Sequence, residues 1–271
     1  LCATAVIGLR NTALVAAVRQ AAWLDPLWMD AVGPLLKRVT RLSIANSRYV
    51  KQSVIERYRL PGVRVAVIPN FIDTGVPRQD RDESRRRLSL EEGQFVLVAV
   101  GNVLPVKDYP TIIRAFAGFR ASGRPCALLV AGEGRGRDAA AALASRMGLN
   151  GEVRFLGALA DVKPVLAAAD VFVHASRSEG MSNAVLEAMA AGLPVVASDI
   201  PANREVMGEG CGLFFAPGDW KGCLKEIEHF ADDRAAASRA GEEAARRINR
   251  VYDSASATMR RERIYRRLAV R

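Results

Sequence analysis

The sequence is poor in the residue types that build metal sites and disulfide frameworks. Its 271 residues include only four cysteines and two histidines. The cysteines are Cys2, Cys126, Cys211 and Cys223, and none forms a C-x-x-C pair. This spacing argues against a zinc site and indicates reduced thiols that pack as small apolar residues. His174, in an apolar run, and His229, in a helical stretch, are interpreted as packed or surface side chains.

Long apolar runs are also missing. No stretch approaches the roughly 20 apolar residues that a membrane-spanning helix needs. The first stretch, residues 1–9, is short, runs into Arg10 and is followed by no cleavage-site pattern. The sequence therefore predicts a soluble, cytoplasmic protein, with the inner face of the cell membrane as an alternative location.

Aromatic residues make up only 6% of the chain, whereas the formal net charge is +10. Such a charge suits nucleic acid, an anionic membrane face or phosphorylated small molecules. No aromatic residue lies among the arginines at 78–87, and only Tyr252 and Tyr265 lie among those at 246–267, so stacking aromatics are not regularly interleaved with the basic residues. We therefore expect no nucleic acid partner, and both a solvated surface and peripheral membrane association remain open.

Short apolar runs alternate with helical patterns from about residue 93 onwards. The runs cover residues 95–102, 126–132, 153–157, 171–176, 194–199 and 212–215. Strands that are apolar throughout are typical of a parallel sheet covered by helices on both faces. Right-handed crossovers then predict an α/β fold with a doubly wound parallel sheet.

The organisation of the chain follows from these patterns. Residues 1–75 contain a helical stretch at 25–41, a strand at 42–47, a helix at 48–58 and a strand at 63–73. They are too few for a complete second α/β domain and are interpreted as its C-terminal part. The charged, proline-containing residues 76–92 predict a linker. Residues 93–250 form the main domain, and 251–271 a C-terminal helix.

Ligands of doubly wound sheets bind where strands end and helices begin. After the run 95–102, Gly101 and Asn102 are followed by Lys107, which precedes a helix. A lysine beside the N–H groups of a helix start suits a phosphate. The alternative is an ordinary glycine turn with a surface lysine.

A second glycine-rich corner contains Gly132 and Gly134. Its spacing does not fit the dinucleotide fingerprint, because Arg137 stands where that fingerprint has its third glycine. We expect a tight turn that approaches a ligand closely.

The third corner is the stretch SRSEGMSNAVLEAMAAGLPVVASD, residues 176–199. It predicts a loop that carries Glu179 and a helix that carries Glu187, with Ser182 or Asn183 as the helix cap. The backbone N–H groups that converge at this helix start belong to Gly180, Met181, Ser182 and Asn183.

Two carboxylates at a binding edge suit hydroxyl groups, while a lysine and a helix N-terminus suit phosphates. A ligand with a sugar at each end of a diphosphate meets these requirements. The alternative is that Glu179 and Glu187 are solvated or capping residues. The D-x-D spacing at 80–82 resembles a metal–nucleotide site, but it follows no strand, and we expect no metal site there.

These residues resemble the family 4 retaining glycosyltransferases, which have the GT-B fold of two Rossmann-like domains. The similarity runs over roughly residues 40–270, through VIPNFID (67–73), VGNVLPVKDYPTIIRAF, LLVAGEG and VRFLG to the third corner. SEGMSNAVLEAMAAGLPVVA carries the E-x7-E signature of that family. The resemblance implies a GT-B donor domain over 93–250, with 1–75 as the end of the acceptor-side domain and 251–271 as a helix that crosses back toward it.

The resemblance also implies roles for single residues. Glu187 would bind the ribose of a nucleotide, Glu179 would face the transferred sugar as the catalytic carboxylate, and Lys107 would bind the diphosphate. Many members carry an arginine where this chain has Asn102, so the diphosphate would meet one charge fewer. The other residues implied in donor binding are Gly101, Gly132, Gly134, Gly180, Met181, Ser182 and Asn183.

The implied function is transfer of a sugar from a nucleotide-diphosphate sugar to a glycan or lipid-linked acceptor, with retained configuration and without a metal or cofactor. Because most of the acceptor-side domain is missing, the chain by itself is expected to bind donor weakly and to be inactive. The alternatives are a donor-binding module without transfer activity and a sugar-nucleotide epimerase of the same fold.

Overall fold

The computed structural model describes residues 14–19, 40–75 and 79–269. The chain divides into two compact units. Unit 1 comprises Leu1–Phe71, Glu179–Met181 and Tyr252–Arg271, and unit 2 comprises Ile72–Ser178 and Ser182–Val251.

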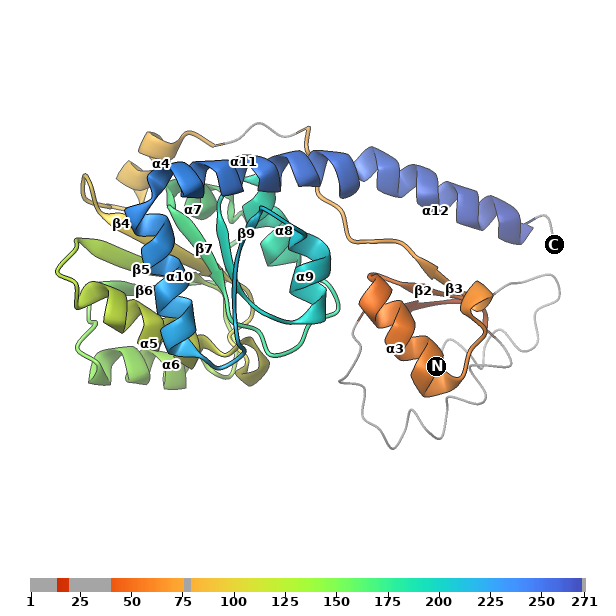
Figure 1. Ribbon diagram of the computed structural model, residues 1–271, viewed down its shortest axis with the longest axis horizontal. Helices are drawn as coiled ribbons and strands as arrows, with labels where there is room; N and C mark the ends of the chain where they lie inside the picture. The colour runs from red at the N-terminus through yellow and green to blue at the C-terminus, as the bar shows by residue number, and fades with distance from the viewer. Residues whose placement is uncertain (1–13, 20–39, 76–78, 270–271) are drawn as a thin grey trace. The chain divides into compact units, whose positions relative to one another are not determined.

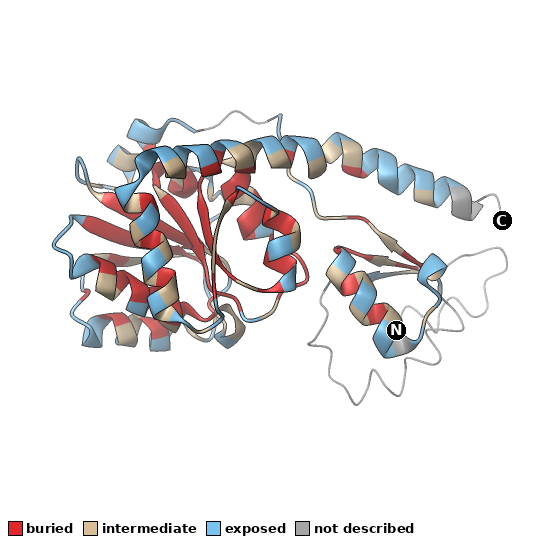
Figure 2. Cartoon of the chain, in the orientation of Figure 1, coloured by how far each residue is buried: buried red, intermediate tan, exposed pale blue. Residues whose placement is uncertain are grey.

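Unit 2 is built on a six-stranded parallel sheet with the order β6-β5-β4-β7-β8-β9. The strands are β4 (Phe95–Val100), β5 (Cys126–Ala131), β6 (Val153–Gly157), β7 (Val171–His174), β8 (Val195–Ser198) and β9 (Gly212–Phe215). Strands β4, β5, β7 and β8 are buried along almost their whole length (Figure 2). Burial on both faces explains why their sequences are apolar without alternation.

Helices cover both faces of this sheet (Figure 1). They are α4 (Arg81–Arg87), α5 (Tyr109–Arg120), α6 (Arg137–Arg146), α7 (Lys163–Ala168), α8 (Asn183–Ala190), α9 (Pro201–Met207), α10 (Trp220–Asp232) and α11 (Arg234–Val251). Helix α5 packs on α6 and α10, whereas α8 packs on α9 and α11. The core between the sheet and α5 includes Leu97, Ile113, Phe116 and Phe119, which are fully buried.

The strand order reverses between β4 and β7. The chain builds β4, β5 and β6 outward in one direction and then returns to place β7 on the other side of β4. In a doubly wound sheet, the loops that leave two such strands diverge and leave a crevice at their carboxyl ends. The loops after β4 and β7 are therefore the ones that the topology places at a ligand site.

Asp170, which directly precedes β7, makes contacts at the amino-terminal ends of the central strands. Its Oδ2 accepts a hydrogen bond from Val96 N at 2.8 Å, and its Oδ1 accepts from Arg81 and Arg234 at 3.0 and 2.8 Å. These contacts join α4 and α11 to the central strands.

Unit 1 contains a parallel sheet of three strands, β1 (Leu14–Val18), β2 (Thr40–Ala45) and β3 (Val65–Val67). Helix α3 (Arg48–Tyr58) follows β2 and is capped by Ser47, whose Oγ accepts from Val50 N at 3.0 Å. The short η1 (Gly62–Arg64) and helix α12 (Ser254–Ala269) complete it. Its buried cluster consists of Ala45, Val50, Val54 and Val65.

The predicted parallel α/β fold is confirmed, but three local expectations are corrected. The expected linker contains helix α4, because Asp80 caps it by accepting from Glu83 N at 2.7 Å. Strand β1 was not predicted. The helical tail is interrupted twice, since Asp233 and Asp253 accept from Ala236 N and Ser256 N and start new helices. The expected helix at 25–41 lies mostly outside the described residues.

Candidate functional site

The loop after β4 begins at Gly101, which has a φ of 136°. The Tyr109 hydroxyl donates to the Gly101 carbonyl at 2.7 Å and so ties the loop to the start of α5. Burial raises the pKa of Tyr109, which keeps this hydroxyl protonated as a donor. Asn102 is exposed, and Lys107 is half-buried in the short η2 (Pro105–Lys107). The loop thus holds the predicted phosphate-binding lysine on an ordered turn.

The loop after β7 is fastened to the loop after β4. Arg177 N and Ser176 Oγ both donate to the Val106 carbonyl, at 2.8 and 3.2 Å. The Arg177 side chain pairs with the buried Asp108 carboxylate at 3.0 Å. These contacts fix the two loops at the reversal point of the sheet. Sequence reasoning gave no role to Arg177 or Asp108, since nothing local connects residues so far apart in the chain.

The glycines after β5 place a third loop directly against the loop after β4. A Cβ on Gly132 would lie 2.0 Å from the Gly101 carbonyl oxygen, and one on Gly134 would lie 2.5 Å from the Val103 carbonyl oxygen. Val103 N donates to the Glu133 carbonyl at 2.9 Å. Close backbone approach between the loops after β4 and β5 therefore requires glycine at both positions. Their predicted contact with a ligand remains a prediction.

Helix α8 begins as the sequence predicts, and its cap is Ser182. The Ser182 hydroxyl accepts from Val185 N at 3.4 Å, while Asn183 is the exposed first residue of the helix. Leu186 and Met189 are fully buried. Glu187, on the same helix, is only half-buried and lines a cavity.

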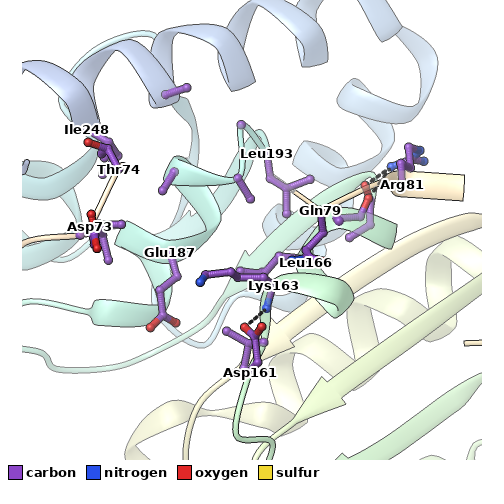
Figure 3. A pocket seen from close by; sticks show the side chains of 18 of the residues that line it. Asp73, Thr74, Gln79, Arg81, Asp161, Lys163, Leu166, Glu187, Leu193 and Ile248 are labelled. Carbon is purple, nitrogen blue, oxygen red and sulfur yellow. Dashed lines mark hydrogen bonds between the residues drawn. The ribbon is translucent and has the colours of Figure 1, made fainter. Parts of the chain in front are cut away.

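This cavity, of about 720 Å³, lies entirely within unit 2. Figure 3 shows Glu187 facing it together with Asp161 and Lys163 from the start of α7. The Asp161 carboxylate accepts from Lys163 N at 2.9 Å. The rest of the lining is mixed: it includes the apolar residues Leu166, Leu193 and Ile248 and the polar residues Asp73, Gln79 and Arg81.

The pKa of Glu187 is raised above its ordinary value. Burial is the largest cause, the negative charge of Asp161 adds to it, and the positive charge of Lys163 opposes it. Burial and Asp161 make the ionised form of Glu187 less favourable. Its carboxylate therefore accepts hydrogen bonds strongly from the hydroxyl groups of a ligand.

The tip of the loop after β7 belongs to unit 1. Glu179, Gly180 and Met181 are buried there, and Met181 Sδ accepts from Asn70 N at 3.2 Å. A Cβ on Gly180 would lie 1.9 Å from the Arg19 carbonyl oxygen. The remaining predicted site residues belong to unit 2: Gly101, Asn102, Lys107, Gly132, Gly134, Ser182, Asn183 and Glu187.

Three observations concern other kinds of site. Among residues 14–19, 40–75 and 79–269, no group of three or more His, Cys, Asp or Glu side chains could hold a metal ion. Asp80 of the D-x-D spacing is the cap of α4, and His174 is a buried residue that stacks on Phe172 with ring centroids 6.3 Å apart. In the part of the chain that the structure describes, no helix is long and apolar enough to cross a membrane.

Comparison of the sequence with known proteins identifies relatives. The family model described as Glycosyl transferases group 1 matches residues 80–247. A lipopolysaccharide core biosynthesis glycosyltransferase of Rhizobium meliloti, LpsE, is 36% identical over 180 residues, which are 66% of this chain and 51% of that protein. D-inositol 3-phosphate glycosyltransferase of Rhodococcus erythropolis is 29% identical over 68% of this chain and 45% of its own length. The chain thus spans about half the length of these relatives.

Solved structures show the same fold. Anabaena HepE in complex with UDP and glucose superposes with a TM-score of 0.87 at 21% identity, covering 94% of this chain and 72% of HepE. WaaG, a glycosyltransferase involved in lipopolysaccharide biosynthesis, has a TM-score of 0.69 at 22% identity, covering 78% of this chain and 59% of its own. The predicted GT-B fold is confirmed. With a family model that matches more than half of its residues, the chain belongs to the Glycosyl transferases group 1 family.

Proposed function

We propose that this chain is the donor-binding part of a retaining, metal-independent glycosyltransferase of family 4. Its reaction is transfer of a sugar from a nucleotide-diphosphate sugar to a glycan or lipid-linked acceptor. The observation that carries the proposal is the joining of two loops at the reversal point of the sheet. One loop presents Lys107, and the other leads into α8, which carries Glu187.

In this proposal, the positive groups of these loops bind the diphosphate of the donor. Lys107 supplies an ammonium group, and the start of α8 supplies backbone N–H groups that Ser182 satisfies only in part. Both kinds of donor are preorganised, so they stabilise the negative charge that develops on the leaving phosphate. One such donor contributes about 3 kcal/mol to a transition state.

In this proposal, Glu187 binds the ribose of the nucleoside. A ribose offers two neighbouring hydroxyl donors, and a carboxylate accepts from both. The cavity beside Glu187 combines polar groups with apolar residues such as Leu166 and Leu193, against which a nucleoside can pack. Support for a nucleotide donor comes also from HepE, whose structures contain UDP and UDP-glucose.

In the reaction, the bond between the anomeric carbon and the diphosphate oxygen breaks, and its electron pair leaves with the nucleoside diphosphate. The acceptor hydroxyl forms the new bond on the same face and gives its proton to the departing phosphate. Glu179 orients the sugar in this scheme. Lys107 and α8 balance the charge of the leaving group, so the proposed chemistry requires no metal.

The chain spans about half the length of these relatives, and we infer that transfer itself also needs an acceptor-side part. We further propose that the protein is cytoplasmic, that it acts in polysaccharide assembly and that it contacts a membrane-borne acceptor. LpsE and WaaG, both named for lipopolysaccharide biosynthesis, support this acceptor class.

Donor binding can be tested on the chain itself by calorimetric titration with UDP, GDP and ADP. We expect one nucleotide to be preferred and Lys107→Ala and Glu187→Gln each to weaken its binding about 10- to 100-fold, because each removes one charge-assisted contact. Lys225→Ala and Glu209→Gln, at exposed positions of unit 2, are the matched controls. Unchanged affinity in both site variants would overturn the assignment.

A further inference from the structure

Arg177 contacts both of the residues that flank Lys107. Its backbone N–H donates to the Val106 carbonyl at 2.8 Å, and its Nε donates to Oδ2 of Asp108 at 3.1 Å. A terminal nitrogen of the same guanidinium lies 3.0 Å from that oxygen. One residue of the loop after β7 therefore holds the backbone before the lysine and the side chain after it.

Asp108 ends the turn that presents Lys107. Its backbone N–H donates to the Pro105 carbonyl at 3.2 Å. Its φ is 48°, in the left-handed region that aspartate adopts more readily than most residues do. Its carboxylate is only 7% exposed. Because a buried charge needs a partner, the contact with Arg177 fixes the orientation of this carboxylate and with it the end of the turn.

The charges of this pair limit what Arg177 itself can do for an anionic ligand. The Arg177 side chain is 61% exposed, but its guanidinium lies 3.0 Å from the Asp108 carboxylate, so the pair carries no net charge. Asn102, on the same loop as Lys107, is uncharged as well. The attraction of this loop for a diphosphate therefore depends on where the ammonium group of Lys107 is held.

We propose that Arg177 is a positioning residue for the diphosphate: it holds Lys107 in place and does not touch the ligand itself. This inference rests on the proposed function, in which Lys107 binds the diphosphate. A lysine on a turn that can move must be ordered when the ligand binds, and the entropy lost in that ordering lowers the affinity. With Arg177 in place, this ordering is complete before the ligand arrives.

The test is calorimetric titration of the full chain with whichever of UDP, GDP and ADP it prefers. Asp108→Gly removes the ion pair, suits the φ of 48° and leaves an arginine that is already exposed. Arg177→Ala alone would leave the Asp108 carboxylate buried without this partner, so it is made together with Asp108→Gly. We expect both the single and the double variant to bind the nucleoside diphosphate about 10-fold more weakly than the parent chain.

Two variants serve as controls. Asp108→Asn keeps a residue that tolerates the left-handed conformation and keeps a neutral acceptor for Arg177, so its affinity should recover to within about threefold of the parent value. Arg124→Ala breaks another arginine–aspartate pair of unit 2, that with Asp232 at 2.6 Å, and should bind within about twofold of the parent chain.

The sign of the change separates positioning from direct contact. If Arg177 bound the phosphate itself, removal of Asp108 would free its guanidinium and strengthen binding, whereas positioning predicts weaker binding. In a Lys107→Ala background, Asp108→Gly should have no further effect, because the two residues act through one ammonium group. The corresponding nucleoside, titrated by NMR, should bind all these variants within about twofold of the parent chain, which a general loss of structure would not allow.

The outcomes separate this inference from the one on which it rests. Tighter diphosphate binding in Asp108→Gly would overturn the positioning role, and so would equal losses in the presence and absence of Lys107. A parent chain that binds none of the three nucleotides, or a Lys107→Ala variant that binds as well as the parent, would overturn the donor assignment and this inference with it.

Discussion

Glu187 shows at the scale of one residue how the proposed ribose-binding carboxylate differs from its neighbours. It is the half-buried acid on a helix whose neighbouring residues Leu186 and Met189 are fully buried. Its pKa is raised by burial first and by Asp161 second. A folded protein gains no stability from such an arrangement, which is typical of residues retained for binding.

Glu187→Gln should therefore stabilise the fold while it weakens nucleotide binding. Because the folded-state pKa lies above the unfolded value, the folded state binds the Glu187 proton more tightly than the unfolded state does. The stability from this proton is present below the unfolded value and is lost as pH rises through the folded pKa. We expect the melting temperature of the variant to exceed that of the parent by about 1–3 °C at pH 7.

Thermal denaturation at pH 4 and pH 7, followed by circular dichroism, measures this effect. The difference between variant and parent should shrink toward pH 4, where the parent carboxyl is protonated. Glu209→Gln, at an exposed position, should show no such pH dependence. A variant that melts below the parent at both pH values would contradict the explanation.

At the scale of elements, the loops after β4, β5 and β7 form one interdependent structure. The loop after β5 approaches Gly101 and Val103 so closely that no side chain fits at Gly132 or Gly134. The loop after β7 is held to Val106 and Asp108 through Arg177. The position of Lys107 thus depends on residues from three corners of the sheet.

Gly134→Ala should displace this structure. The new Cβ would lie 2.5 Å from the Val103 carbonyl oxygen at a φ of 152°, so both the backbone and the neighbouring loop must move. We expect a loss of about 2–4 kcal/mol in the free energy of unfolding and a weaker affinity for the nucleotide.

Gly148→Ala separates steric contact from backbone strain in this test. Gly148 has a φ of 70° but no heavy atom within 4 Å of an added Cβ. Its alanine variant should lose only about 1 kcal/mol and keep its nucleotide affinity. Urea denaturation and titration measure both quantities. Equal effects of the two substitutions would show that the contact with Val103 is unimportant.

The sequence was most informative where structure is set by local pattern. The apolar runs predicted the strands of unit 2, and the small and capping residues around Ser182 predicted the start of α8. It failed where partners are distant. Helix α4 lies in the expected linker and is anchored by Arg81 to Asp170, 89 residues later. The pair of Arg177 and Asp108 joins residues 69 apart, and no periodicity encodes such a contact.

At the scale of the whole molecule, the two units have unequal cores. Unit 2 surrounds a sheet whose central strands β4 and β5 are buried along almost every residue. In the described part of unit 1, the buried cluster comprises four residues of modest size, from Ala45 to Val65. Local stability follows buried apolar contact, so the two units should open at different free energies.

Hydrogen exchange tests this expectation. Amide protection in β4 and β5 should exceed that in β2 and β3 by about 100-fold or more, because the latter strands exchange through local opening of unit 1. Mass spectrometry of peptides from each strand provides the measurement, and addition of the preferred nucleotide should slow exchange in the loops at 101–108 and 175–183. Equal protection across both sheets would show that the units open together.

The reversal of strand order between β4 and β7 also means that the two neighbouring loops are synthesised at different times. The loop after β4 is complete about 70 residues before the loop that it meets. A nascent chain that has released β4, β5 and β6 from the ribosome holds Lys107 but has neither β7 nor α8. With Glu187 as the proposed ribose ligand, nucleotide should stabilise folding only after Glu187 has emerged, and ribosome-bound chains halted before that point should be insensitive to it.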